Sequence, residues 1–130
     1  MLNWGMYRDG VDPGFADDCD ACLGPLPTTY NVVAGFRSIA KETELYAQGR
    51  TTPGEIVTWA KPGTSAHGYG LAIDVVPASG SYDTTRPEWQ NLFAAVRAAP
   101  HLHSGEDFPP GETDAPHIER LNWRLFISGS

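Results

Sequence analysis

The sequence has few basic residues, few cysteines and no long apolar stretch, and each shortage excludes a class of protein. Lys and Arg number 9 against 16 Asp and Glu, so the formal net charge is -7. A protein that binds nucleic acid needs a basic face for the phosphates, which excludes this class. No apolar run approaches the roughly 20 residues that a membrane-spanning helix needs, so we expect no membrane insertion. The N-terminal MLNWGMYRDG shows no secretory signal.

The two cysteines, Cys19 and Cys22, lie close together in DDCDACLG. A zinc ribbon would need a second pair of cysteines. A redox CxxC motif usually opens a helix after a strand, and no strand-like run precedes this one. Phe15, Cys19 and Cys22 fall on one face of a short helix. We therefore expect both thiols to be buried in the core.

The chain of 130 residues has the length of one domain, residues 1–130. Periodicity and turn residues predict helices over residues 12–23, 38–48 and 86–98, and strands over 30–36, 69–76 and 116–122. The tail WRLFI, residues 123–127, is interpreted as a further strand, and residues 101–115 as a long polar loop. The pattern predicts an α+β fold with a small antiparallel sheet and flanking helices.

The stretch TSAHGYGLAIDVVP places His67 and Asp74 seven residues apart, around two glycines. Asp74 interrupts an apolar run, and a buried carboxylate needs a partner. That partner is either a metal ion or an arginine or backbone donor. The glycines allow the chain to bend so that the histidine comes back toward the strand. The spacing alone leaves both interpretations open.

Two other segments carry candidate groups, ETDAPHIER and GFRS. In the first, Asp114 precedes His117 by three residues, across a proline that favours an extended turn. Such a carboxylate can take a proton beside a metal site, or it can be a plain loop residue. In the second, Arg37 can bind a substrate carboxylate or an oxyanion, or pair with a surface acid.

Taken in order, GFRS, LYAQGRTTPGEIVTWAKPGTSAHGYGLAIDVVP and DAPHIE resemble the VanY-like zinc D,D- and L,D-peptidases of peptidoglycan. The resemblance covers roughly residues 30–122. It is strongest to L-alanyl-D-glutamate endopeptidases of phage endolysins and bacterial autolysins. It implies the zinc scaffold shared by D-Ala-D-Ala peptidases and hedgehog domains.

The resemblance also implies a role for each matching residue. His67, Asp74 and His117 would bind Zn²⁺, and Asp114 would activate the zinc-bound water that attacks the peptide carbonyl. Arg37 would steady the carbonyl or a substrate carboxylate. Ser65 would help to order the site or bind the substrate.

The segment HLHSGEDFPPGET departs from the family, which often has a stretch rich in tryptophan and glycine there. Phe108 stands where an aromatic residue is expected. His101 and His103 are interpreted as loop or substrate-contacting residues rather than as a metal pair. Glu119 shares the strand face of His117, and is either a partner of that histidine or a surface acid paired with Arg120 or Arg124.

The resulting hypothesis is a monomeric zinc peptidase that cuts peptidoglycan stem peptides, with L-alanyl-D-glutamate endopeptidase ahead of D-Ala-D-Ala carboxypeptidase. The alternative of another class is a non-catalytic zinc-scaffold binding module, against which Asp114 argues. A domain without metal would leave Asp74 to find another partner. Without a signal peptide, we expect synthesis in the bacterial cytoplasm and release to the wall through a holin or with a phage.

Overall fold

The computed structural model describes residues 1–58 and 60–127. Its helices are α1 (Pro13–Leu23), α2 (Ile39–Ala47) and α3 (Pro87–Ala98). Its strands are β1 (Leu2–Asn3), β2 (Tyr30–Ala34), β3 (Ala72–Pro77), β4 (Leu102–Ser104) and β5 (His117–Arg120). Short 3₁₀ turns are η1 (Ala66–Tyr69), η2 (Gly105–Asp107) and η3 (Trp123–Phe126). No helix among the described residues is long and apolar enough to cross a membrane.

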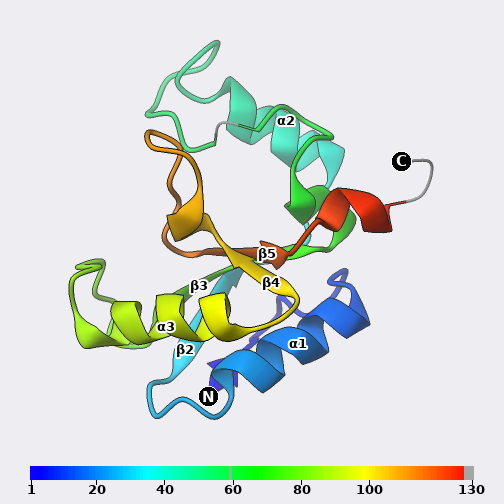
Figure 1. Ribbon diagram of the computed structural model, residues 1–130. Helices are drawn as coiled ribbons and strands as arrows, with labels where there is room; N and C mark the ends of the chain where they lie inside the picture. Colours follow the sequence, from blue (N-terminus) through cyan, green and yellow to red (C-terminus); the bar gives the residue numbers. More distant parts are fainter. Residues whose placement is uncertain (59, 128–130) are drawn as a thin grey trace.

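The strands form one sheet in the order β1-β2-β3-β5-β4 (Figure 1). All neighbouring pairs are antiparallel except β1 and β2, which are parallel. The α+β fold predicted from the sequence is therefore confirmed, with the two-residue β1 as an addition at the sheet edge. The central strands β3 and β5 come from the two segments that carry the candidate histidines.

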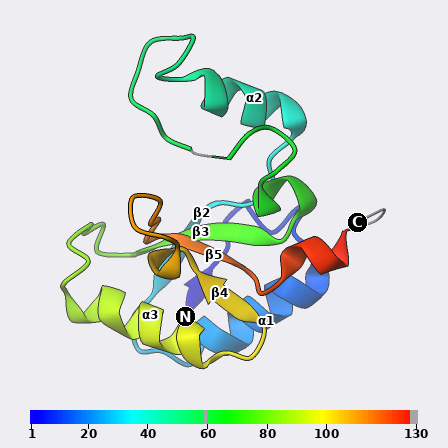
Figure 2. The same cartoon turned by 45° about the horizontal axis from the view of Figure 1, so that its top comes forward.

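The two faces of the sheet have different neighbours. Helices α1 and α3 lie together below the sheet and α2 stands above it (Figure 2). Side chains alternate between faces along a strand, so Ile73 and Val75 share one face while Asp74 lies on the other. Ile73 and Val75 are fully buried in the core, together with Phe15 of α1 and Trp89 of α3. The apolar face of the sheet therefore packs against the core, and the opposite face, which carries Asp74, is available for a functional site.

The helix starts follow from their capping residues. The carboxylate of Asp12 accepts a hydrogen bond of 3.0 Å from the backbone N–H of Phe15, and the hydroxyl of Ser38 accepts one of 3.2 Å from Lys41. Helices α1 and α3 both have proline at the start. The predicted helices agree with the observed ones to within about a residue at each end.

Three sequence-based assignments were wrong. The strand predicted from residue 69 begins only at Ala72, because η1 occupies residues 66–69 and Gly70 then takes a left-handed conformation with φ of 71°. The loop predicted over residues 101–115 contains β4 and η2. The tail predicted as a strand forms η3, in which Trp123 is buried.

The cysteines are free thiols, and Cys19 is fully buried as predicted. Cys22 is half-buried and packs against the core cluster. Burial raises the pKa of both thiols, that of Cys22 to about 11. Both side chains are therefore structural and poorly suited to redox chemistry.

Candidate metal centre

His67 sits in the turn η1, just before β3, with 2% of its surface exposed. The Ser65 hydroxyl starts this turn by accepting a hydrogen bond of 3.3 Å from the His67 N–H. The imidazole Nδ1 lies 2.9 Å from the carbonyl oxygen of Gly35, at the end of β2. Because a carbonyl can only accept, Nδ1 carries the proton, and Nε2 presents a lone pair to its surroundings.

Asp74 and His117 are brought together by strand register. They are direct partners across the antiparallel pair β3 and β5, and Ala34 of β2 faces Asp74 from the other side. The pairing of β2 with β3 shifts register between Val32 and Ala34. Bulges of this kind are common beside active sites because they redirect side chains.

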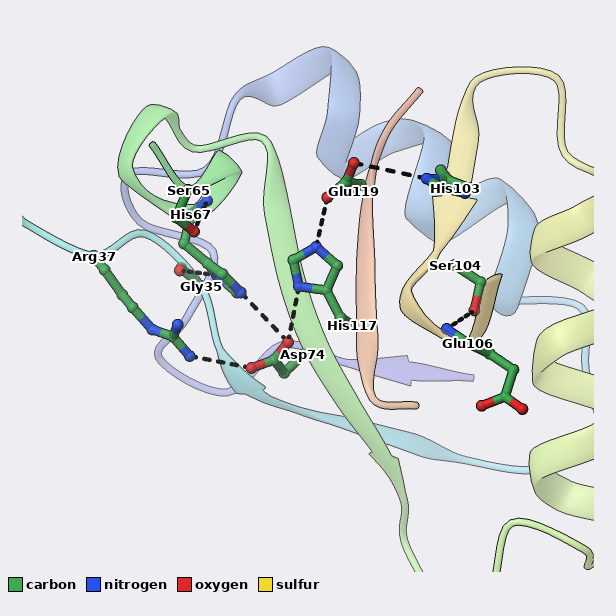
Figure 3. A network of polar contacts seen from close by, with 10 residues as sticks. All are labelled: Gly35, Arg37, Ser65, His67, Asp74, His103, Ser104, Glu106, His117 and Glu119. Carbon is green, nitrogen blue, oxygen red and sulfur yellow. Dashed lines mark hydrogen bonds and ion pairs between the residues drawn. The ribbon is translucent and has the colours of Figure 1, made fainter. Parts of the chain in front are cut away.

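The three side chains point their ligand atoms at one place (Figure 3). Asp74 Oδ1 lies 3.4 Å from His67 Nε2 and 3.5 Å from His117 Nδ1. One ligand atom from each residue falls within 4.8 Å of the others. Ligands bound about 2.0 Å from a tetrahedral zinc are roughly 3.3 Å apart, and the two distances from Asp74 Oδ1 match this separation.

The hydrogen-bond partners of the histidines require a positive charge between them. His117 Nε2 lies 2.8 Å from the carboxylate of Glu119, an acceptor, which leaves its Nδ1 lone pair facing Asp74. Asp74 Oδ1 is buried and has no hydrogen-bond partner. Three electron pairs therefore converge on one point. A metal ion satisfies all three at once, whereas a proton satisfies only one pair of atoms.

The pKa shifts of the metal-free centre show the same demand for a cation. Burial alone would raise the pKa of Asp74, but the approach of His117 and His67 holds it well below its ordinary value. Burial alone would lower the pKa of His117, but the carboxylates of Asp74 and Glu119 raise it to about 9. The raised pKa of His117 reflects how strongly its two carboxylate neighbours favour a positive charge at this place.

Arg37 and Ser65 each contact a candidate metal ligand. The Arg37 guanidinium donates a hydrogen bond of 3.1 Å to Asp74 Oδ2, the carboxylate oxygen that faces away from the histidines. Ser65 caps the turn that carries His67. Both residues also line the adjoining cleft, so their predicted contacts with substrate remain predictions.

Asp114 lines the same cleft, which has a volume of about 810 Å³ and reaches His67, Asp74 and His117. Its backbone carbonyl accepts a hydrogen bond of 3.1 Å from the His117 N–H. Burial raises the pKa of its carboxyl, and the negative charge of Asp74 adds to this, against the charges of His117, His67 and Arg37. A carboxylate with a raised pKa beside a metal site is suited to accept and return a proton.

The loop departing from the family pattern supplies one wall of the cleft. His103 of β4 pairs with Glu119 of β5, and its Nδ1 lies 3.7 Å from Glu119 Oε2. Phe108 packs between the two histidine rings, with its centroid 5.3 Å from His117 and 5.4 Å from His103. Glu119 thus contacts His117, as one of the two sequence interpretations held. His101, by contrast, is exposed and contributes its backbone carbonyl to Leu121.

Sequence reasoning missed two contributors to this centre. The Gly35 carbonyl fixes the tautomer of His67, and no side-chain pattern can reveal a backbone acceptor. Glu42 of α2 is buried, with 5% of its surface exposed, next to the turn that carries His67. As an acidic residue in a helix with no other buried side chain, it gave no signal of burial.

Comparison with known proteins places most of the chain in one family. The family model described as "VanY: D-alanyl-D-alanine carboxypeptidase" matches residues 27–124. A curated relative, the peptidoglycan L-alanyl-D-glutamate endopeptidase CwlK of Bacillus subtilis (strain 168), is 58% identical over 43 residues. That alignment spans 33% of this chain and only 26% of the relative.

Solved structures share the fold at low sequence identity. The L-Ala D-Glu endopeptidase ChiX of Serratia marcescens superimposes with a TM-score of 0.62 at 21% identity, over 92% of this chain and 86% of that one. The vancomycin-resistance D,D-pentapeptidase VanY, as its E175A mutant in complex with Zn(II), gives a TM-score of 0.55 at 18% identity. That match covers 85% of this chain and 72% of the other.

Proposed function

This chain belongs to the VanY family of D-alanyl-D-alanine carboxypeptidases, and from that premise we propose that it is a zinc endopeptidase of peptidoglycan. Its substrate is the stem peptide, and the bond cut is the one between L-alanine and D-glutamate. The observation that carries the proposal is the convergence of His67 Nε2, Asp74 Oδ1 and His117 Nδ1 on one point beside a cleft.

Two comparisons support the choice of bond. The relative that is 58% identical over 43 residues is an L-alanyl-D-glutamate endopeptidase, and a solved endopeptidase of that type shares the fold over 86% of its own chain. A cleft of about 810 Å³ also has room for residues on both sides of a scissile bond.

The three converging residues would hold the zinc ion, and its remaining position would face the cleft. When bound, zinc supplies a positive charge that polarises a carbonyl oxygen and acidifies water to a pKa of about 7. Glu119 keeps His117 in the tautomer whose Nδ1 is free to bind metal. Gly35 does the same for His67 through its carbonyl oxygen.

Asp114 and Arg37 both line the cleft and would both act on the substrate. The Asp114 carboxylate accepts the proton of the attacking water and passes it to the leaving amine of D-glutamate. Its raised pKa makes the carboxylate a stronger base, which favours uptake of that proton. The Arg37 guanidinium donates one hydrogen bond to Asp74 and lines the cleft, where it would also donate to the scissile carbonyl oxygen.

A defined stem pentapeptide that begins with L-Ala-γ-D-Glu tests the proposal directly. The zinc-loaded protein should release L-alanine and leave a fragment whose new N-terminus is D-glutamate, as seen by mass spectrometry. Asp114→Asn should remove this activity while the protein still binds zinc. Intact peptide after incubation with fully loaded protein would contradict the proposal.

The second candidate is D-Ala-D-Ala carboxypeptidase, which the family description itself names. A carboxypeptidase needs a cation for the terminal carboxylate, and the cleft contains Arg37 and Arg124. Release of D-alanine from the same pentapeptide, with the L-Ala-D-Glu bond left intact, would select this activity instead.

A further inference from the structure

The loop that follows helix α2 forms one wall of the cleft, and neither the helix nor this loop contributes to the apolar core. Among the described residues, the core cluster includes none between Val32 and Ala66. Glu42 is the one buried residue of α2, while Ile39 is 57% exposed. The helix stands apart from the two core helices in Figure 2. Among the described residues, the buried carboxyl group of Glu42 connects this helix to the turn beside it.

The loop that faces the cleft is tied to this helix. Arg50 donates hydrogen bonds of 2.7 Å to the carbonyl of Tyr46, in α2, and of 3.0 Å to the carbonyl of Thr58, in the loop. Ile56 and Val57 of that loop line the cleft and are largely exposed. The position of α2 therefore sets the position of an apolar cleft wall.

Glu42 connects α2 to the turn that carries His67. Its Oε2 accepts a hydrogen bond of 2.8 Å from the N–H of Gly63. Its Oε1 packs against Gly68, where a Cβ atom would lie only 2.7 Å away. These two glycines bracket the segment that contains Ser65 and His67. The carboxyl group thus contacts the chain just before the ligand-bearing turn and again within it.

This arrangement does not favour folding. Glu42 Oε1 is buried without a hydrogen-bond partner, and a carboxyl group removed from water in this way costs free energy. An apolar side chain of similar size would avoid that cost. Stability alone therefore does not explain why position 42 carries a carboxyl group.

We propose that Glu42 is a positioning residue that holds the His67 turn in place against α2 and the cleft-lining loop tied to this helix. This inference rests on the zinc site of the proposed function. Without the hydrogen bond to Gly63, the turn is free to shift, and the geometry of His67 toward Asp74 loosens. The same shift moves the wall formed by Ile56 and Val57.

Zinc affinity, measured by competition with a chromogenic chelator, tests this role without reference to any substrate. Glu42→Leu keeps the volume and removes the acceptor, and should weaken zinc binding by about tenfold. Glu42→Gln keeps an acceptor and should bind zinc to within about threefold of wild type. The exposed neighbour Glu44, changed to Gln, is the matched control and should bind like wild type. Equal zinc affinity for Glu42→Leu and wild type would overturn the proposal.

A double-mutant cycle with Gly68→Ala covers the case in which Glu42→Leu does not fold. The three nearest atoms to the new Cβ all belong to Glu42, so Gly68→Ala should weaken zinc binding by pushing this side chain away. Combined with Glu42→Ala, it should cause no further loss beyond that of Glu42→Ala alone. Additive losses would overturn the proposal, because they would mean that Gly68 acts without Glu42.

A kinetic measurement separates this inference from the proposed function. With zinc at saturation, Glu42→Leu should raise KM for the stem peptide by about tenfold, with a smaller change in kcat, since the cleft wall has moved. If wild type cuts no stem peptide but the zinc affinities follow the expected order, the proposed function fails and the positioning role stands. If wild type cuts the peptide and KM of Glu42→Leu is unchanged, Glu42 does not position the wall.

Discussion

Asp74 and His117 face each other directly across the antiparallel strands β3 and β5, with Oδ1 and Nδ1 3.5 Å apart. Two of the three candidate ligands are therefore set by one strand register. A shift of one residue in this pairing would turn one of the two side chains to the core face. Because Ile73 and Ile118 are paired on that core face and buried, the apolar packing that stabilises the sheet also fixes the metal centre.

The first expected outcome concerns metal content. Purified wild-type protein should contain about one zinc per chain by elemental mass spectrometry, and His67→Ala should contain almost none, because two remaining ligands hold zinc weakly. His101→Ala is the control, since this exposed histidine lies away from the centre and should leave the content unchanged. A folded wild-type protein that takes up no zinc after reloading would remove the basis of the proposed function.

Asp114→Asn should lower kcat on the stem peptide by about 10²- to 10⁴-fold and leave zinc content near one per chain, because the change removes a base without removing a ligand. Glu112→Gln changes a carboxylate two residues away on the same cleft-lining loop and should retain activity. Steady-state kinetics together with metal analysis distinguish this outcome from loss of metal. Wild-type kcat in the Asp114 variant would assign the proton transfer to another group.

Sequence patterns predicted the helices, whose starts depend on capping residues within the same segment. The starts of α1 and α2 follow from Asp12 and Ser38, which cap their own helices. Strand β4 was missed because it is three residues long and exists only through its pairing with β5. The tail was misassigned because its apolar residues suit a strand, whereas Trp123 is instead buried and stacked on Tyr69 with centroids 5.6 Å apart.

The candidate metal ligands were predicted from the family resemblance rather than from local patterns. Spacing alone left Asp74 and His67 ambiguous, and the resemblance of three ordered segments to a known family supplied the set. What neither route supplied is the support around the ligands. The carbonyl of Gly35 contacts His67, and the carboxyl of Glu42 contacts the glycines on either side of it, through tertiary contacts that leave no periodic trace in the sequence.

Glu119 should matter for metal affinity through its hydrogen bond with His117. Glu119→Ala should weaken zinc binding by about 10- to 100-fold, because His117 then loses the acceptor that fixes its tautomer. Glu119→Gln retains an acceptor oxygen and should lose much less. Chelator competition gives both affinities. If the alanine and glutamine variants bind zinc equally well, the orientation of His117 comes from packing against Phe108 instead.

The thermal stability of the protein without zinc should depend on pH, because His117 can then bind a proton. The folded-state pKa of His117 is raised to about 9, above the ordinary value of 6.5, by Asp74 and Glu119. A raised pKa stabilises the fold fully below about pH 6.5, and this stabilisation is lost as the pH rises through about 9. Thermal unfolding in the presence of a chelator should therefore show a falling Tm between these pH values.

Zinc-loaded protein should lack this decline, because the metal ion replaces the proton. His117→Gln should also lack it, and a metal-free wild type whose Tm stays level from pH 6.5 to 9 would show that His117 is neutral there.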